Sequence, residues 1–198
     1  MNRHMALICG LLAAGISGFA DSVKLDNPSF ESGSGSYWIN RPAMARVDAS
    51  ESSDGMKSLA ITPEAGKTIS VVFNTLQRKD TVFELQFDAR TDAPENGPVL
   101  TLAVMLQGAK PICFFNSDRQ QLKALSTPAK LTTQWKTLKY TIGPIPEKVM
   151  NQEVKRLLFY FNVKPGTKNG KIWIDHIRLD AQPAASATGP AAKAAPAK

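Results

Sequence analysis

One acidic residue, Asp175, lies in an apolar segment where a charged side chain is unusual. In KIWIDHIRLD (171–180), Asp175 lies between Ile174 and Ile177, in a segment with the apolar residues of a buried strand. A carboxylate beside a core is costly unless it is ion-paired, hydrogen-bonded or bound to a metal. The fold must therefore supply a partner for Asp175, which could be a Lys or Arg side chain, backbone amides or a metal ion.

Residues that could carry out catalysis are few. In TVFELQFDAR (81–90), Glu84 and Asp88 share one strand face, about 13 Å apart at four residue rises, which exceeds the usual carboxylate separations in glycosidases. After residue 20, the sequence has one histidine, His176, and one cysteine, Cys113, which lies in the apolar stretch PICFF. These cannot build a His-rich or Cys-type zinc site. We therefore expect no catalytic residues, and a protein that is not an enzyme.

The two ends of the 198-residue chain differ from its middle. Residues 1–20 have a basic start, an apolar run too short to span a bilayer, and small residues before a cleavage site, which is typical of a secretory signal peptide. Residues 181–198 are rich in Ala, Pro and Lys, a composition typical of a disordered tail. The body, 21–180, has the size of one domain. We expect an exported protein, secreted, periplasmic or at the cell surface, without a membrane span.

The charge balance argues against one class of partner. The chain has 24 basic and 17 acidic residues and a net charge of +7. The basic residues are scattered, without a stripe or a known nucleic-acid motif, so we expect no nucleic-acid partner. The sequence does not determine the oligomeric state.

Alternation of apolar and polar residues dominates the body and predicts strands. The strand candidates, separated by Gly, Pro, Asn and Asp turns, are 57–63, 67–74, 81–90, 98–107, 134–142, 156–163 and 171–179. A short stretch, 147–154, could form a turn or two of helix. Many short strands with one apolar face predict an all-β, antiparallel β-sandwich of the jelly-roll type.

Five motifs along the body occur in a recognisable order. They are LDNPSFESGSGSYWIN (25–40), SSDGMKSLAI (52–61), DTVFELQFDAR (80–90), LTTQWKTLKYTI (131–142) and GKIWIDHIRL (170–179). This order resembles that of the exported carbohydrate-binding modules of families 4, 9 and 22, which share a galactose-binding-domain-like jelly roll. The resemblance implies a fold more strongly than a function, because one fold hosts many functions.

The resemblance implies a partner for Asp175. In such modules the acid of the first motif and that of the last strand lie close together and help to bind a structural calcium ion, which would make Glu31 and Asp175 metal ligands here. Backbone carbonyls near Asn27 or Ser52 could complete the shell. The family's second Asp is replaced by His176, which alternation would turn away from Asp175 and towards the surface.

The resemblance also implies that the protein binds a polysaccharide or oligosaccharide without catalysis. Its site would combine aromatic platforms with polar strand faces, and the candidates are Trp38, Tyr37, Glu84, Gln86, Asp88, Arg90, Gln107, Tyr160 and Asn162. Trp135 and Trp173 are expected to pack in the structure. Two alternatives stay open: the polar faces could be solvated strands with cross-strand salt bridges, and the protein could be an extracellular structural or interaction protein without a sugar site.

Overall fold

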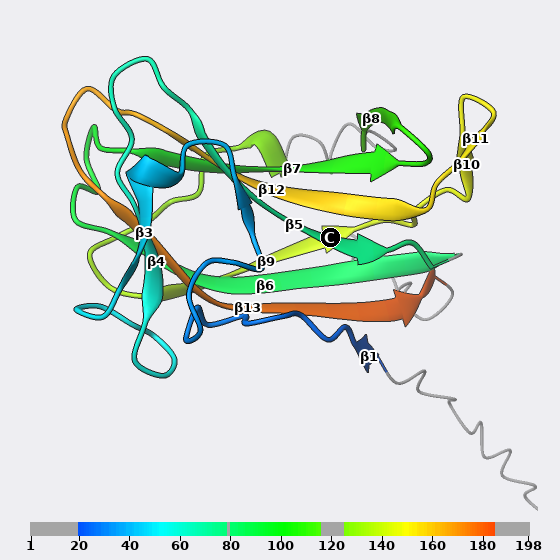
Figure 1. Ribbon diagram of the computed structural model, residues 1–198, viewed down its shortest axis with the longest axis horizontal. Coiled ribbons are helices and arrows are strands. Elements are labelled where there is room, and N and C mark those ends of the chain that lie inside the picture. Colours follow the sequence, from blue (N-terminus) through cyan, green and yellow to red (C-terminus); the bar gives the residue numbers. More distant parts are fainter. Residues whose placement is uncertain (1–19, 79, 116–124, 185–198) are drawn as a thin grey trace, which may run out of the picture.

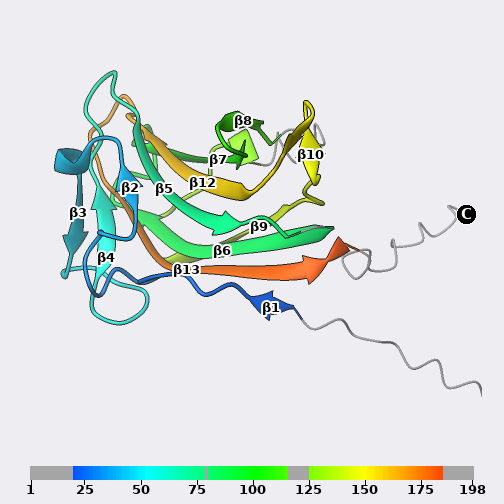
Figure 2. The same ribbon diagram turned by 45° about the vertical axis from the view of Figure 1, so that its right-hand side comes forward.

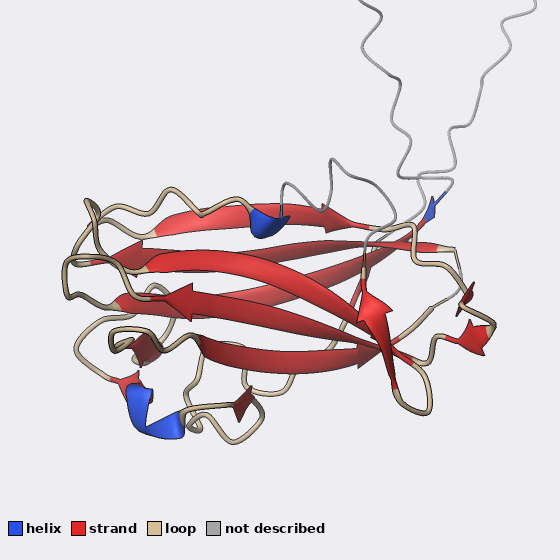
Figure 3. Cartoon of the chain, turned by 90° about the horizontal axis from the view of Figure 1, so that it is seen from above, coloured by secondary structure: helices blue, strands red, loops and turns tan. Residues whose placement is uncertain are grey.

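Two antiparallel sheets stacked face to face make up most of the structure, a computed structural model that describes residues 20–78, 80–115 and 125–184 (Figure 1). The axes of the long strands in the two sheets are roughly aligned, and neighbouring strands run in opposite directions (Figure 3). The predicted all-β jelly-roll sandwich is thereby confirmed. The signal peptide, except Ala20, and most of the predicted tail lie outside the described residues. In the described part of the chain, no helix combines the length and apolar content needed to cross a bilayer.

Sheet A, the lower layer in Figure 1, contains the last long strand and the strand with the polar face of 81–90. Its order is β3 (Ala45–Asp48), β4 (Ser58–Ile61), β13 (Ile172–Pro183), β6 (Thr81–Thr91) and β9 (Lys136–Ile142), and β1 (Asp21–Ser22) pairs with β13. A short 3-10 helix, η1 (Pro42–Met44), precedes β3. β3 and β4 stand steeply against the long strands at one end of the sandwich (Figure 2).

Sheet B forms the upper layer. Its order is β2 (Trp38–Ile39), β5 (Ile69–Leu76), β12 (Arg156–Lys164), β7 (Val99–Gln107) and β8 (Pro111–Phe114). The register aligns outward residues into rows: Trp38, Val72, Tyr160 and Ala103 form one, and Asn74, Leu158, Met105 and Phe114 form the next. Such rows place side chains from up to four strands beside one another on one surface.

Phenylalanines from both sheets hold the two layers together. Phe161 of β12 meets Phe87 of β6 edge-on, with ring centroids 4.8 Å apart, and Phe159 stacks on Phe73 at 4.8 Å. Alternation explains this, since every second residue of β6 and β12 is buried. The buried side of each strand is its apolar side, as the alternation of apolar and polar residues predicts.

Two differences from the predicted elements lie in the C-terminal part of the body. The stretch 147–154, predicted as helical turns, is a hairpin of β10 (Lys148–Val149) and β11 (Gln152–Glu153), because Met150 and Asn151 both have positive φ and make a tight reversal. In addition, β13 continues three residues past the predicted end of the body, to Pro183, and stays paired with β6.

Candidate functional site

Asp175 is fully buried and its carboxylate is bound by backbone and hydroxyl donors. Its Oδ2 accepts hydrogen bonds from the N–H of Ser53 (2.8 Å), the N–H of Asp54 (2.9 Å) and the hydroxyl of Ser53 (3.1 Å). Its Oδ1 accepts one from the N–H of His176 at 2.7 Å. Of the partners left open by the sequence, backbone amides are the ones observed.

Glu31 binds the same loop from the other end of the chain. Its Oε1 accepts hydrogen bonds from the N–H groups of Met56 (2.7 Å) and Lys57 (2.9 Å), and the Lys57 ammonium donates to the Glu31 carbonyl at 2.7 Å. The loop 53–57 therefore joins the first motif to the last strand. We call this arrangement the loop clasp, meaning Glu31, Asp175 and the loop 53–57.

The loop clasp bears on the calcium ligands implied by the resemblance. The N–H groups that donate to the Asp175 and Glu31 carboxylates place partial positive charge where a cation would have to approach. A calcium shell needs six to eight oxygen ligands. Within the described ranges, no three His, Cys, Asp or Glu side chains gather in a way that could hold a metal. The donor set thus fits carboxylate capping rather than a calcium cage. Calcium binding at Glu31 and Asp175 stays a prediction of the family resemblance alone.

A melting experiment separates these two arrangements. Because the clasp is held by N–H donors, we expect melting temperatures in calcium and in EGTA to agree within about 2 °C, less than 1 kcal/mol for a domain of this size. Glu31→Gln is the matched control. A rise of several degrees in calcium that Glu31→Gln abolishes would instead establish a metal site.

The sequence predicted that His176 turns away from Asp175 and towards the surface, and the structure places its partly exposed side chain beside Asp88 on the outward side of sheet A. The β13–β6 register shifts between Asp175 and Arg178, and His176 has a φ of 49°. A bulge of this kind breaks strict alternation. The His176 Nδ1 consequently lies 3.5 Å from Oδ2 of Asp88, with the side chain 32% exposed.

The predicted carbohydrate-binding residues are split between opposite surfaces of the sandwich. Four lie on the outward side of β6 in sheet A: Glu84, Gln86, Asp88 and Arg90. Four others belong to the outward side of sheet B: Trp38, Gln107, Tyr160 and Asn162. Because two layers of core side chains separate these surfaces, the nine candidates cannot form one site.

The polar side chains of sheet A bind mainly one another. Gln86 donates to Glu84, the hydroxyl of Thr137 donates to Asp88 at 2.6 Å, and Arg90 forms an ion pair with Glu51. This matches the alternative reading of a cross-linked polar strand face.

The two other tryptophans have different surroundings. Trp173 is 6% exposed and packs on the outward side of sheet A, where its ring lies 5.2 Å from the Arg90 guanidinium and its Nε1 donates to Asp48 at 3.1 Å. The predicted packing of Trp173 is thus confirmed, although it lies outside the central core cluster. Trp135 was expected in the core but is half-buried in the segment before β9.

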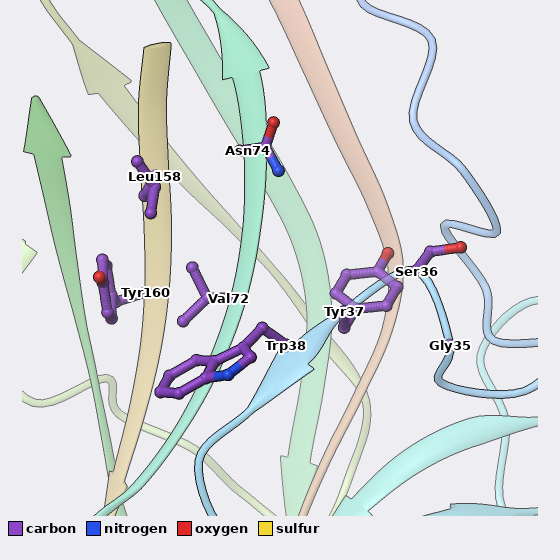
Figure 4. A pocket seen from close by; sticks show the side chains of 8 residues that line it. All are labelled: Gly35, Ser36, Tyr37, Trp38, Val72, Asn74, Leu158 and Tyr160. Carbon is purple, nitrogen blue, oxygen red and sulfur yellow. The ribbon is translucent and has the colours of Figure 1, made fainter. Parts of the chain in front are cut away.

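A pocket of about 550 Å³ opens on the outward side of sheet B, and we call it the face pocket. Its lining residues come from the β2 segment, β5 and β12: Gly35, Ser36, Tyr37, Trp38, Val72, Asn74, Leu158 and Tyr160. Figure 4 shows the Trp38 indole reaching across Val72 towards Tyr160, with Asn74 on the far side. Trp38 is 61% exposed, so its ring is available to a ligand.

The remaining candidates on this side have distinct positions. Tyr37 was predicted as an aromatic platform for a sugar, and this prediction is wrong. Its side chain is only 7% exposed, packs on Phe30 and lines the pocket only from its edge. Tyr160 is half-buried beside Phe114, and burial raises the pKa of its hydroxyl, which keeps it protonated. Asn162 hydrogen-bonds to Ser70 at 2.7 Å, and neither it nor Gln107 lines the pocket.

Five lining residues were missed by sequence reasoning, and two of them, Gly35 and Ser36, belong to the segment before β2. Val72 and Leu158 are apolar residues at outward strand positions, and Asn74 ends the run KTISVVFN. The sequence did contain a signal for two of the five: Val72 and Leu158 are apolar residues at positions of β5 and β12 where alternation predicts polar ones. Val72 is buried and Leu158 is half-buried, so together they give the pocket an apolar floor.

Comparison with known proteins places this geometry in a fold class. No protein-family model matches the sequence, and no curated protein matches it. Among solved structures, it is similar to TmCBM61, a family 61 module, in complex with β-1,4-galactotriose (TM-score 0.54, 16% identity, 78% of this chain and 95% of that chain). It is also similar to the CBM22-1 xylan-binding domain of Paenibacillus barcinonensis Xyn10C (0.52, 15%, 84% and 96%).

An enzyme has a similar fold as well. The Stig cyclase Fisc from Fischerella sp. TAU, in complex with a pyrrolidinylidene-indole, matches with a TM-score of 0.54 at 15% identity, over 84% of this chain and 100% of that chain. The chain therefore has the jelly-roll fold of carbohydrate-binding modules, as the order of its five motifs predicted. At these identities the similarity establishes the fold, and activity must be argued from the site.

Proposed function

We propose that the protein binds a carbohydrate chain non-catalytically in the face pocket of sheet B. The observation that carries the proposal is the Trp38 ring, which is 61% exposed and borders a pocket of about 550 Å³. Its neighbours across the register are Val72 and Tyr160. The fold shared with carbohydrate-binding modules supports the proposal.

The chemistry of the lining residues suits a neutral sugar. An indole and a phenol present flat apolar surfaces that cover the C–H face of a pyranose ring, and each also carries a polar group. The Asn74 amide can donate and accept hydrogen bonds with hydroxyls. The eight lining residues are all uncharged, which favours a neutral chain over an anionic one.

The proposed role is extracellular recognition. The apolar N-terminal run and small residues of the sequence support export, and polysaccharides are then the accessible partners. The polar groups on the outward side of sheet A are cross-linked, which supports a binding protein over a hydrolase with a free acid and base.

Binding to immobilised polysaccharides tests the proposal directly. In affinity electrophoresis through β-1,4-galactan, xylan and cellulose derivatives, we expect retardation by at least one polymer. Trp38→Ala and Tyr160→Ala should each weaken binding to that polymer by roughly tenfold or more. Removing an aromatic ring on which a ligand ring lies typically costs about 1–3 kcal/mol of binding free energy.

Trp135→Ala is the matched control, because it removes the same side chain outside the face pocket. It should migrate like the wild type. Unretarded migration of the wild type in every polymer would refute the proposal, as would equal losses for Trp38→Ala and Trp135→Ala.

A second candidate function has one observation in its favour. Leu76 is 66% exposed and Phe114 is 52% exposed, and both lie on the outward side of sheet B. Exposed apolar residues around a pocket also suit a protein partner. An interaction protein without a sugar site would fail the electrophoresis test and would lose its partner in Leu76→Ala and Phe114→Ala variants.

A further inference from the structure

A second, smaller pocket adjoins the face pocket at the edge of the sandwich. This edge pocket has a volume of about 160 Å³ and shares Ser36, Tyr37 and Asn74 with the face pocket. Its other lining residues are Lys24, Leu25, Asp26 and Phe73. The shared residues make one surface that runs from Trp38 past Asn74 to the N-terminal segment.

The edge pocket exists because sheet B has an open edge there. In the described chain, β2 pairs with β5 only at Trp38–Val72 and Ile39–Val71, whereas β5 runs on to Leu76. Ser70 directs its backbone N–H and C=O to this edge, where both bond to Asn40. Alternation turns the backbone groups of Asn74 in the same direction, so they border the edge pocket with its side chain.

The two pockets differ in charge. The face pocket is lined by uncharged residues, while the edge pocket adds an ammonium from Lys24 and a carboxylate from Asp26, both exposed. Tyr37 stands between them, and its hydroxyl donates to the Asn27 carbonyl at 3.4 Å. Burial, with the nearby Asp26 and Asp175 carboxylates, raises the pKa of Tyr37, so it stays a neutral donor.

We propose that the bound carbohydrate continues from Trp38 past Asn74 into the edge pocket, where Lys24 and Asp26 hold the hydroxyls of a further sugar unit. This rests on the proposed function and deepens it: the ligand is a neutral chain of several units bound over two subsites. The face pocket covers apolar sugar faces. The edge pocket supplies charge-assisted hydrogen bonds, which are stronger than neutral ones.

Chain length and charge removal together test the second subsite. Calorimetry would use the disaccharide and hexasaccharide of β-1,4-xylan and of β-1,4-galactan as probes. We expect the hexasaccharide of one series to bind roughly tenfold or more tightly than its disaccharide. Lys24→Ala/Asp26→Asn should weaken the hexasaccharide by roughly tenfold and leave the disaccharide within about twofold, because charged hydrogen bonds are lost at one end only.

The matched control is Glu95→Gln/Lys110→Ala, which removes one acid and one base from exposed loops away from both pockets. It should bind both probes like the wild type, and circular dichroism would verify that each variant is folded. Length-independent binding, or equal hexasaccharide affinity in the Lys24/Asp26 variant and the control, would overturn the second subsite while leaving the proposed function in place. Absence of binding by the wild type to every probe and polysaccharide would overturn both.

Discussion

Asp175→Ala is expected to lower the free energy of unfolding by about 3 kcal/mol, because a buried acceptor of several hydrogen bonds is removed at once. The N–H groups of Ser53, Asp54 and His176 all lose their acceptor. Part of the cost is relieved because Ser53 and Asp54 are exposed and can turn to water. The loop 53–57 would then be held mainly by Glu31. Urea unfolding followed by tryptophan fluorescence measures this difference.

Two further variants test the explanation. Asp180→Ala changes the same residue type on the same strand at a half-buried position, and we expect a loss below about 0.5 kcal/mol. Asp175→Asn keeps one carbonyl oxygen as an acceptor, so its loss of stability should lie between those of Asp175→Ala and Asp180→Ala. The new NH₂ group would replace the other oxygen and would face an N–H donor without an acceptor for it. Equal stability of Asp175→Ala and Asp180→Ala would contradict the capping role.

Phe161→Ala is expected to have the largest effect on stability, a loss of about 4 kcal/mol, which is typical of a buried Phe replaced by Ala. Phe161 is fully buried in β12, contacts Phe87 of the opposite sheet at 4.8 Å between centroids, and lies 5.8 Å from Phe73 of its own sheet. Its removal leaves a cavity where the two layers meet, and the strands on both sides are too well paired to collapse into it.

Phe114→Ala is the matched control for this core variant. The side chain of Phe114 is 52% exposed on the outward side of β8, so its removal creates no cavity, and we expect a loss below about 1 kcal/mol. Thermal and urea unfolding of both variants would compare the same chemical change in two environments. Similar losses for the two would mean that the sheets do not pack through Phe161.

The long strands could be predicted because their residues alternate. β6, β7 and β12 each bury every second side chain, and this period is visible in the sequence without knowledge of any partner strand. The hairpin β10–β11 could not, since its strands are two residues long and its turn uses Met150–Asn151 instead of the Asn–Gly signal. β3 was missed as well, since its four residues, ARVD, contain a single large apolar side chain, Val47.

The candidate site could be predicted only in part. Trp38 stood out as an aromatic residue after a Gly/Ser-rich stretch, and it is exposed beside the face pocket. Tyr37, its neighbour, was indistinguishable by type but is buried, because adjacent residues of an extended segment point in opposite directions. The edge pocket had no sequence signal, since it forms where β2 stops pairing with β5.

By itself the sequence determined the β-sandwich, its principal strands and which side chains share one side of a strand, because period two is a local property of the chain. Only the tertiary structure decided which of those sides share a surface. It separated Glu84 and Tyr160 onto opposite layers, and it gave Asp175 partners in a loop 121 residues away in sequence. The physical reason is that burial of the two apolar sides against each other fixes the stacking of the sheets, and no local pattern encodes which polar groups that stacking brings together.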